Sequence, residues 1–223
     1  MNLAKSREFF DPSLDETRIS IIGCGSVGSS LAELFARCGL TNIDLYDFDN
    51  VCSHNIHNQM FRASDIGRPK VEALKDILVE INPDLAETVR LKPKGWQGRL
   101  LPGYIFLAVD SIELRRKFVE AHMNSPYVRA VFDIRTGLTG AQHYAADWSI
   151  LADRENLLKG MQFSHEEAAA ETPVSACGVT LGVVTTVRLI TALAVNNFIR
   201  YSKGEGLWHF VEIDGFTGML DCF

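Results

Sequence analysis

The residues best suited to chemistry begin with a set of closely spaced glycines. Gly23, Gly25 and Gly28 follow G-x-G-x-x-G spacing, with Ser26 inside the same turn. Glycines in this pattern allow a tight turn and let the backbone approach a phosphate group at the positive end of the next helix. Asp47 lies about 20 residues further on, where an acidic side chain can reach a ribose hydroxyl. The pattern predicts a nucleotide site; the alternative is a glycine turn used only for tight packing of a helix on a sheet.

A polar stretch after Asp49 supplies many further hydrogen-bonding groups. Asn55, His57, Asn58 and Gln59 fall within a few residues of one another. Amide and imidazole groups are costly to bury unless they find hydrogen-bond partners, and a ligand could be one of those partners. This stretch is therefore a second candidate for ligand contacts.

Two charged residues stand at the ends of predicted elements. Lys70 follows Pro69 in the first turn of a predicted helix. The helix dipole disfavours a cation there, so the ammonium group is either solvated or offered to an anion. Asp110 follows the apolar strand 104–109, at the edge where open α/β sheets bind ligands. The alternative role for Asp110 is to cap the helix that follows.

The elements that must position these residues alternate between strand and helix. Short apolar runs rich in β-branched residues indicate strands, and apolar residues three or four positions apart indicate helices. The order predicts an α/β fold with a mostly parallel central sheet, antiparallel strands in the C-terminal half and helices on both faces. Strands are expected at 19–22, 43–46, 88–91, 104–109, 128–134, 141–146 and 207–213, and helices at 26–38, 69–81, 112–123 and 179–201.

The remaining segments are predicted to be irregular. Residues 1–17 form an N-terminal arm, and 215–223 a C-terminal tail. The segment 147–175 lacks sustained periodicity and is mostly polar, so we expect a long crossover loop of functional importance. Residues 179–195 are strongly apolar, but Arg188 interrupts them, which favours a buried helix over a membrane span.

Composition bounds the class of protein. The 223 residues fit a single domain spanning 1–223 with a substantial core. The net charge of −6 argues against nucleic acid as the main partner. Five cysteines without a C-x-x-C pair give no support to a zinc site. Free thiols in a chain without a signal peptide predict a cytoplasmic protein.

The order of these motifs resembles the ThiF/MoeB/HesA family of adenylating enzymes, which are related to the ubiquitin-activating enzymes. The resemblance rests on GCGSVGSSLAELFARCGLTNIDLYDFDNV, HNIHNQ and DIGRPKVEAL, which lie in one unbroken order between residues 18 and 110. It continues more loosely through 133–201. The combination of G-x-G-x-x-G, D-x-D-x-V, N-x-x-x-Q and G-x-P-K is far more specific than any one part.

The resemblance implies a reaction and a set of partners. Family members use ATP and Mg²⁺ to adenylate the C-terminal glycine carboxylate of a small ubiquitin-like or sulfur-carrier protein, or of a short peptide, releasing pyrophosphate. The chain would then act as a homodimer, because Arg7 resembles the arginine that such dimers lend to the neighbouring subunit's ATP. Cys177 lies where sulfur-transferring and thioester-forming relatives keep a reactive cysteine; the alternative is a small buried residue.

Roles for the site residues also follow from the resemblance. The three glycines with Ser26 would cradle the nucleotide, and Asp47, with Asp49 in the same motif, would hold the ribose. Asn55, Asn58 and Gln59 would line the phosphate region, Lys70 would neutralise the phosphates rather than stay solvated, and Asp110 would bind Mg²⁺.

The chain departs from the family pattern in one place that matters for charge. Many members have an arginine where this chain has Asn58, so a phosphate-facing cation is missing, and Arg62 or Arg68 could substitute for it. The HNIHNQ and DIRTGL segments resemble a phage- or plasmid-borne branch of the family. Two other classes of function stay open at this point. An NAD-dependent oxidoreductase would explain the glycines and Asp47, and a nucleotide-binding scaffold without catalysis would explain Asn58.

Overall fold

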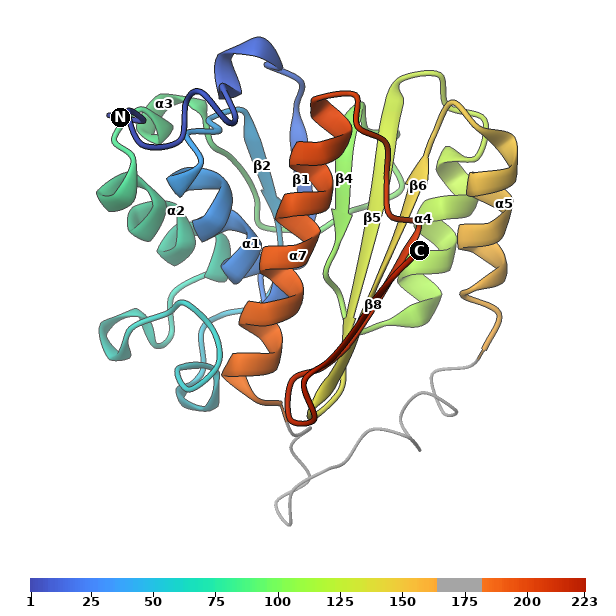
Figure 1. Cartoon of the computed structure of the whole chain (residues 1–223). Coiled ribbons are helices and arrows are strands. Elements are labelled where there is room, and N and C mark those ends of the chain that lie inside the picture. Colours follow the sequence, from blue (N-terminus) through green and yellow to red (C-terminus); the bar gives the residue numbers. More distant parts are fainter. Residues whose placement is uncertain (164–181) are drawn as a thin grey trace.

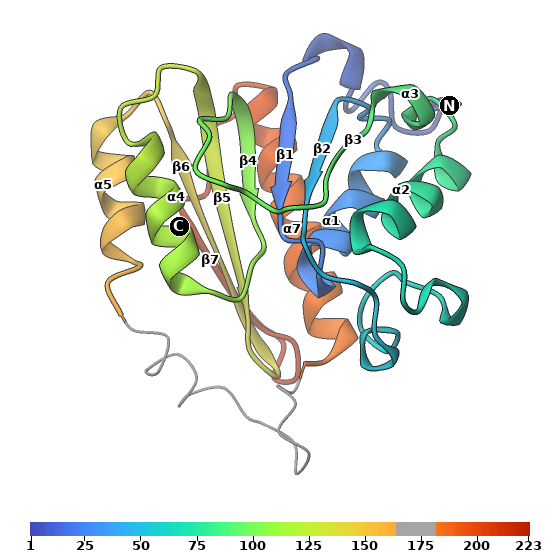
Figure 2. The same cartoon turned by 180° about the vertical axis from the view of Figure 1, so that it is seen from behind.

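The computed structural model describes residues 1–163 and 182–223. The strands in this part of the chain form one mixed sheet. The sheet has eight strands within these residues, in the order β3-β2-β1-β4-β5-β6-β7-β8 (Figures 1 and 2). The first five positions pair in parallel: β1 (Ile19–Ile22), β2 (Ile43–Tyr46), β3 (Arg90–Lys92), β4 (Gly103–Leu107) and β5 (Val128–Thr136). The last three pair antiparallel: β6 (Gly140–Asp147), β7 (Phe210–Asp214) and β8 (Met219–Cys222).

Helices cover both faces of the sheet. The helices α1 (Ser26–Arg37), α2 (Lys70–Ile81) and α7 (Val184–Ser202) lie on one face, and α4 (Ile112–His122) and α5 (Leu151–Lys159) on the other (Figures 1 and 2). The short helix α3 (Leu85–Thr88) follows α2, and single 3-10 turns occur at Pro12–Leu14, Ser53–Asn55 and Ala63–Asp65. The predicted α/β class, with its parallel half, antiparallel half and two helical layers, is confirmed.

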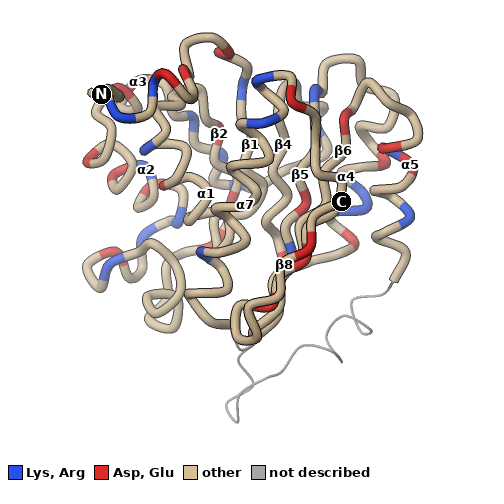
Figure 3. Tube along the Cα trace, viewed as in Figure 1, with Lys and Arg blue, Asp and Glu red and all other residues tan. Residues whose placement is uncertain are grey.

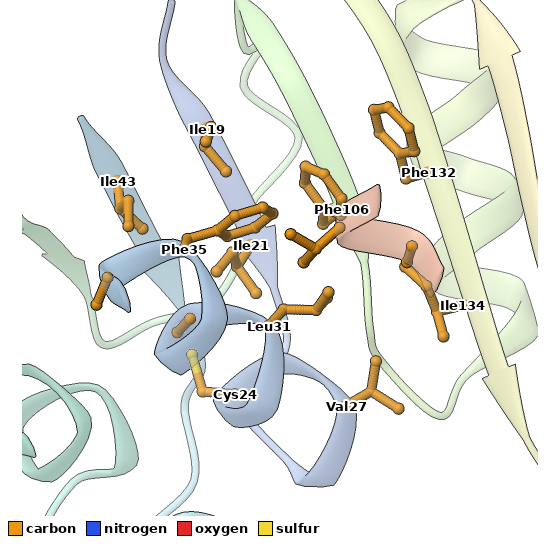
Figure 4. Close-up of a cluster of buried hydrophobic side chains, with 14 of the residues drawn as sticks. Ile19, Ile21, Cys24, Val27, Leu31, Phe35, Ile43, Phe106, Phe132 and Ile134 are labelled. Atoms are coloured by element: carbon orange, nitrogen blue, oxygen red, sulfur yellow. The ribbon is translucent and has the colours of Figure 1, made fainter. Parts of the chain in front are cut away.

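Alternation along the strands divides the core between these two faces. Ile21 and Phe106 point toward α1 and α7, whereas Ile22 and Leu107 point toward α4. Successive side chains of a strand face opposite sides of a sheet, so a central strand with helices on both faces must be apolar throughout. Figure 4 shows the first face, where the Phe35 ring meets the Phe106 ring edge-on at 4.9 Å between centroids.

Two predicted irregular segments contain regular structure. The helix α5 lies inside the segment expected to be a loop, and β8 lies inside the segment expected to be a tail. Leu157 is the single buried residue of α5, so the helix has no apolar stripe to reveal it. All four residues of β8 are exposed at the sheet edge, so that strand has no alternating pattern either. The predictions are therefore wrong at residues 151–159 and 219–222, and for the same reason, since little of either element is buried.

Smaller differences concern element ends. The strand expected at 88–91 begins at Arg90, because α3 extends to Thr88. The last long helix begins at Val184 within the described residues, and the last predicted strand begins at Phe210. No helix in residues 1–163 or 182–223 is long and apolar enough to cross a membrane.

Candidate nucleotide-binding site

The glycine turn joins β1 to α1 at the carboxyl ends of the parallel strands. Gly23 has φ of +96°, and a Cβ there would lie 2.7 Å from the carbonyl oxygen of Ala108. A Cβ on Gly28 would lie 1.8 Å from the carbonyl oxygen of Gly23. Gly23 and Gly28 are therefore required by close backbone approach within the protein itself.

The middle glycine has a different environment. A Cβ on Gly25 would meet nothing within 4 Å, so this position faces open space. Gly25 is also the N-cap of α1, and it offers no side chain to the first amides of the helix, which starts at Ser26. Unpartnered first-turn amides and the positive end of the helix dipole together suit a phosphate group. The space at Gly25 and the amides behind it fit a nucleotide phosphate.

Asp47 fastens the glycine turn to the end of β2. One carboxylate oxygen accepts a hydrogen bond of 2.7 Å from the backbone N–H of Cys24, and the other accepts one of 2.8 Å from the N–H of Asp49. Burial raises the pKa of Asp47 above its usual value, against the effect of these two bonds. The carboxylate thus holds the turn in place, and its predicted contact with a ribose stays a prediction.

Lys70 is buried and paired. Its Nζ donates a hydrogen bond of 2.8 Å to the Asp49 carboxylate, and its backbone N–H donates one of 2.9 Å to the carbonyl of Asp49. The residue is 7% exposed, whereas the Asp49 side chain is 51% exposed. A freely solvated Lys70, one of the two alternatives for this residue, is therefore wrong. The ammonium is held beside the turn by a carboxylate that remains open to solvent.

The polar stretch is only partly satisfied internally. The Asn55 side-chain oxygen accepts a hydrogen bond of 2.8 Å from the N–H of Cys52, so part of its role is local. The side-chain oxygen of Gln59 is buried and has no hydrogen-bond partner within the described residues. An unpartnered buried acceptor costs free energy that a donor on a ligand can recover. Asn58 lies close to the start of α7, where a Cβ on Gly182 would be 3.2 Å from its side-chain nitrogen.

Asp110 lies three residues after the end of β4, on the other side of the glycine turn. The adjoining residues touch that turn, since a Cβ on Gly23 would meet both the Ala108 carbonyl and the Val109 side chain. Ser111 caps α4, because its Oγ accepts a hydrogen bond of 3.2 Å from the N–H of Leu114. The capping alternative for Asp110 is therefore wrong, and its exposed carboxylate is not occupied by that role.

These residues meet where the direction of strand order reverses. The chain passes from β1 outward to β2 and β3, then returns so that β4 pairs with the opposite side of β1. Open α/β sheets bind ligands in the crevice outside the strand ends at such a switch point. The glycine turn, the Asp49–Lys70 pair and Asp110 therefore come from three separate elements that end at one edge of the sheet.

Arginines account for the main differences from the sequence prediction. Arg62 pairs with Glu80, and Arg68 pairs with Asp65 at 3.2 Å and Asp76 at 2.6 Å, so both proposed substitutes for the missing cation are engaged by acids. The sequence reasoning missed the side chain of Arg188, which reaches Met60, close to the polar stretch.

A largely buried cluster behind Asp110 was also missed. Arg115 and Arg135 both pair with Asp133, which is 0% exposed. The available signal was that Asp133 and Arg135 are charged residues two apart near the end of a mostly apolar strand, and therefore share one face.

One predicted site residue, Arg7, does not join this group within one chain. The arm that carries Arg7 packs against Gly39 through Leu3 and Pro12, and the Arg7 guanidinium pairs with Asp11 at 2.9 Å. Gly39 lies past the far end of the 12-residue α1, about 18 Å along the helix axis from the glycine turn. A role for Arg7 at a nucleotide thus requires a second copy of the chain. Cys177 lies outside the described residues.

The donor set fits magnesium. Residues 1–163 and 182–223 contain no group of three or more His, Cys, Asp or Glu side chains that could hold a metal ion. Mg²⁺ is usually held by one or two carboxylates together with substrate phosphates and water, so the Asp110 carboxylate beside a phosphate position matches its needs.

Lys and Arg are interspersed with Asp and Glu along the described chain (Figure 3).

Comparison with known proteins decides the family. A model of the ThiF family matches residues 3–220. The chain belongs to the ThiF family. This ThiF-family chain is 25% identical over 212 residues to the molybdopterin-synthase adenylyltransferase of Haemophilus influenzae, covering 92% of the chain and 83% of that protein. It is 41% identical over 70 residues to the ubiquitin-like modifier-activating enzyme 5 of Arabidopsis thaliana, covering 31% of the chain and 16% of that enzyme.

Solved structures agree on the fold. The ThiF-family chain matches Escherichia coli MccB crystallised with ATP at a TM-score of 0.73 and 14% identity, covering 95% of the chain and 65% of MccB. It also matches the Escherichia coli tRNA N6-threonylcarbamoyladenosine dehydratase TcdA at a TM-score of 0.64 and 17% identity, covering 91% and 94% of the two chains. The chain therefore spans about two thirds of MccB and under a fifth of the ubiquitin-like modifier-activating enzymes.

Proposed function

We propose that this chain uses ATP to adenylate the C-terminal carboxylate of a small ubiquitin-like protein, a sulfur-carrier protein or a peptide. The observation that carries the proposal is the meeting of the open position at Gly25, the buried Lys70 and the exposed Asp110 at one edge of the sheet. This set offers backbone amides and a cation to phosphates and a carboxylate to a metal ion. A hydride-transfer enzyme would need neither the Lys70–Asp49 pair nor Asp110.

The reaction is a nucleotidyl transfer that needs no general base. A carboxylate oxygen of the substrate attacks the α-phosphorus of ATP and forms a new oxygen–phosphorus bond. The bond from the α-phosphorus to the bridging oxygen breaks, and pyrophosphate leaves with that electron pair. Because the attacking carboxylate is already ionised, the site must mainly position the reactants and stabilise charge.

Each residue then has a defined task. The amides at the start of α1 bind phosphate oxygens, and Lys70 turns its charge from Asp49 toward them. Gln59 and Asn55 present side-chain amides next to the same space, with Asn58 in the place of a cation. Asp47 keeps the turn closed and reaches the ribose. Mg²⁺, held by Asp110, would supply charge neutralisation of the phosphates.

The partner and the assembly belong to the same proposal. The molybdopterin-synthase adenylyltransferase of Haemophilus influenzae aligns with most of the chain. MccB has been crystallised with the peptide MccA. Both likenesses support a protein or peptide carboxylate as the substrate. We propose a carrier that ends in glycine and a homodimer in which Arg7 reaches the partner's ATP. After adenylation, the Cys177 thiol attacks the acyl carbon of the adenylate, a thioester forms, and the acyl–phosphate bond breaks to release AMP.

Exchange of labelled pyrophosphate into ATP tests this function. The assay would offer small ubiquitin-like proteins and peptides that end in Gly-Gly, with Mg²⁺ present. We expect exchange that depends on a free C-terminal carboxylate and disappears when the carboxylate is amidated. Exchange that is equally fast with the amidated substrate would contradict the proposal, because no acyl-adenylate could then form.

A further inference from the structure

The buried arginine–aspartate cluster, formed by Arg115, Asp133 and Arg135, lies directly behind Asp110. Asp133 comes from β5 and is fully buried, while Arg115 comes from the first turn of α4 and is 6% exposed. One oxygen of the Asp133 carboxylate accepts from Arg115, and the other accepts from Arg135 at 2.8 Å and 2.6 Å. Both oxygens of a buried carboxylate are thus used, and the guanidinium of Arg115 is held in one place.

The Arg115 guanidinium also donates hydrogen bonds to backbone carbonyls near the ends of two strands. It donates to the carbonyl of Leu107 at 3.1 Å, to the carbonyl of Val109, and to the carbonyl of Ile134 at 3.0 Å. The planar fork of a guanidinium suits several fixed acceptors at once. The bond to Val109 matters most here, since that carbonyl belongs to the peptide group that joins Val109 to Asp110.

Arg135 connects the cluster to the neighbouring elements. Arg135 donates to the carbonyl of Gly160 at 2.9 Å, and its guanidinium carbon lies 4.4 Å from the centre of the Tyr144 ring. Its side chain therefore links β5 to the end of α5. Because Arg135 fills the second oxygen of Asp133, the carboxylate cannot turn away from Arg115 without losing two further hydrogen bonds.

Stability alone gives a poor reason for such a cluster. Removing charges from water is costly, and buried ion pairs can often be replaced by apolar residues without loss of stability. Burial and the neighbouring Arg135 charge lower the pKa of Arg115 to about 9, and the negative Asp110 opposes that shift. Asp110 is therefore electrostatically coupled to the cluster as well as tied to it through the backbone.

We propose that Arg115, held by Asp133, positions the Val109–Asp110 peptide group so that the Asp110 carboxylate faces the metal-bound nucleotide. Arg115 and Asp133 are then positioning residues, because neither touches the substrate. The inference rests on the proposed function, in which Asp110 holds Mg²⁺. It assigns a task to a charged cluster that the nucleotide contacts themselves do not explain.

Calorimetric titration with ATP, with and without Mg²⁺, tests this role in the full chain. Arg115→Met keeps the aliphatic stem and removes the fork. We expect the gain in ATP affinity that Mg²⁺ gives to fall by roughly 10–100-fold, as for other residues that orient a metal ligand. Affinity for metal-free ATP should stay within about twofold, since the glycine turn and Lys70 lie on other elements.

A neighbouring arginine provides the matched control. Arg116 lies on the same helix and donates to the carbonyls of Met161 and Phe163 rather than to the residues around Asp110. Arg116→Met should keep the full Mg²⁺ effect. A full Mg²⁺ effect in folded Arg115→Met would overturn the positioning role while leaving the proposed function intact.

A second variant keeps the test decisive if Arg115→Met does not fold. Asp133→Asn has the same shape but loses the charge that holds both arginines, and we expect the same weakening of the Mg²⁺ effect. A folded Asp133→Asn with the parent's Mg²⁺ effect would overturn the inference. A parent chain that binds no ATP under either condition would overturn the proposed function and this inference together.

Discussion

Lys70 is the residue at which the structure decides most clearly between two alternatives that its position in the sequence leaves open. Its place in the first turn of a helix, where a cation is disfavoured, left a solvated side chain open, whereas the family resemblance implied a lysine that faces phosphates. Burial and the 2.8 Å bond to Asp49 remove that option. A lysine ammonium whose partner is an exposed carboxylate can exchange that partner for a phosphate.

Replacing Lys70 should weaken phosphate binding directly. We expect Lys70→Ala to lose roughly 1.5–3 kcal/mol of ATP binding free energy, the usual range for hydrogen bonds to charged groups. Lys75→Ala, on the same helix, is the control and should bind ATP like the parent. Calorimetry at fixed Mg²⁺ measures both. Equal losses in the two variants would mean that only the general charge of α2 matters.

Asp110 and Ser111 should separate metal binding from stability. Asp110 is exposed and Ser111 is the cap of α4. We expect Asp110→Asn to change the free energy of unfolding by less than about 0.5 kcal/mol while abolishing the Mg²⁺ effect on ATP affinity. Ser111→Ala should instead cost about 1 kcal/mol of stability. Denaturant unfolding of both variants measures these stabilities. A larger loss of stability in Asp110→Asn than in Ser111→Ala would instead make Asp110 the cap of α4.

At the scale of the element, the glycine turn shows how one motif serves two purposes. Gly23 and Gly28 are fixed by contacts inside the protein, and Gly25 faces open space. The sequence could predict this turn, its strand and its helix because all of the signals lie within a few residues of one another. It could not predict that Arg115 reaches Asp133, or Arg188 reaches Met60, because those contacts depend on how distant elements pack.

Elements with little buried surface also escaped sequence reasoning. The helix α5 buries only Leu157, and β8 buries none of its residues, so neither has the periodic pattern on which such predictions depend. The nucleotide side of the sheet was predictable because its strands and helices are buried and regular. The charged cluster was not, because a buried ion cluster has no local pattern.

Alanine at two of the glycines should give opposite results. Gly28→Ala places a methyl group 1.8 Å from the Gly23 carbonyl, so we expect a loss of at least about 1–3 kcal/mol of stability, the usual cost of overpacking. Gly25→Ala has room and should fold with little change, but its methyl group would occupy the space offered to a phosphate. Thermal unfolding and ATP titration together measure the pair. Unchanged ATP affinity in Gly25→Ala would remove that position from the site.

At the scale of the whole molecule, the two ends of the sheet are separated by the length of α1. The candidate nucleotide-binding residues lie at one end, and the arm with Arg7 lies at the other. A single chain therefore cannot bring Arg7 to its own nucleotide, so its use requires a symmetric dimer in which each arm serves the partner.

Oligomeric state tests that arrangement. We expect light scattering to give the mass of a dimer at micromolar concentration, and Arg7→Ala to slow pyrophosphate exchange without dissociating the dimer. Arg37→Ala, which also removes an arginine that pairs with an acid four residues away, is the control and should exchange normally. A fully active monomer would exclude the contribution of Arg7 in trans.

The central claim is that the site at the end of β1 is built for a nucleoside triphosphate with its metal ion. The most direct test is a pair of titrations of the parent chain by calorimetry, one with ATP and Mg²⁺ and one with NAD. We predict that ATP binds more tightly than NAD and that its affinity rises with Mg²⁺, because Lys70, the amides of α1 and Asp110 all act on phosphates or their cation. Tighter binding of NAD, with no effect of Mg²⁺ on ATP, would contradict the claim.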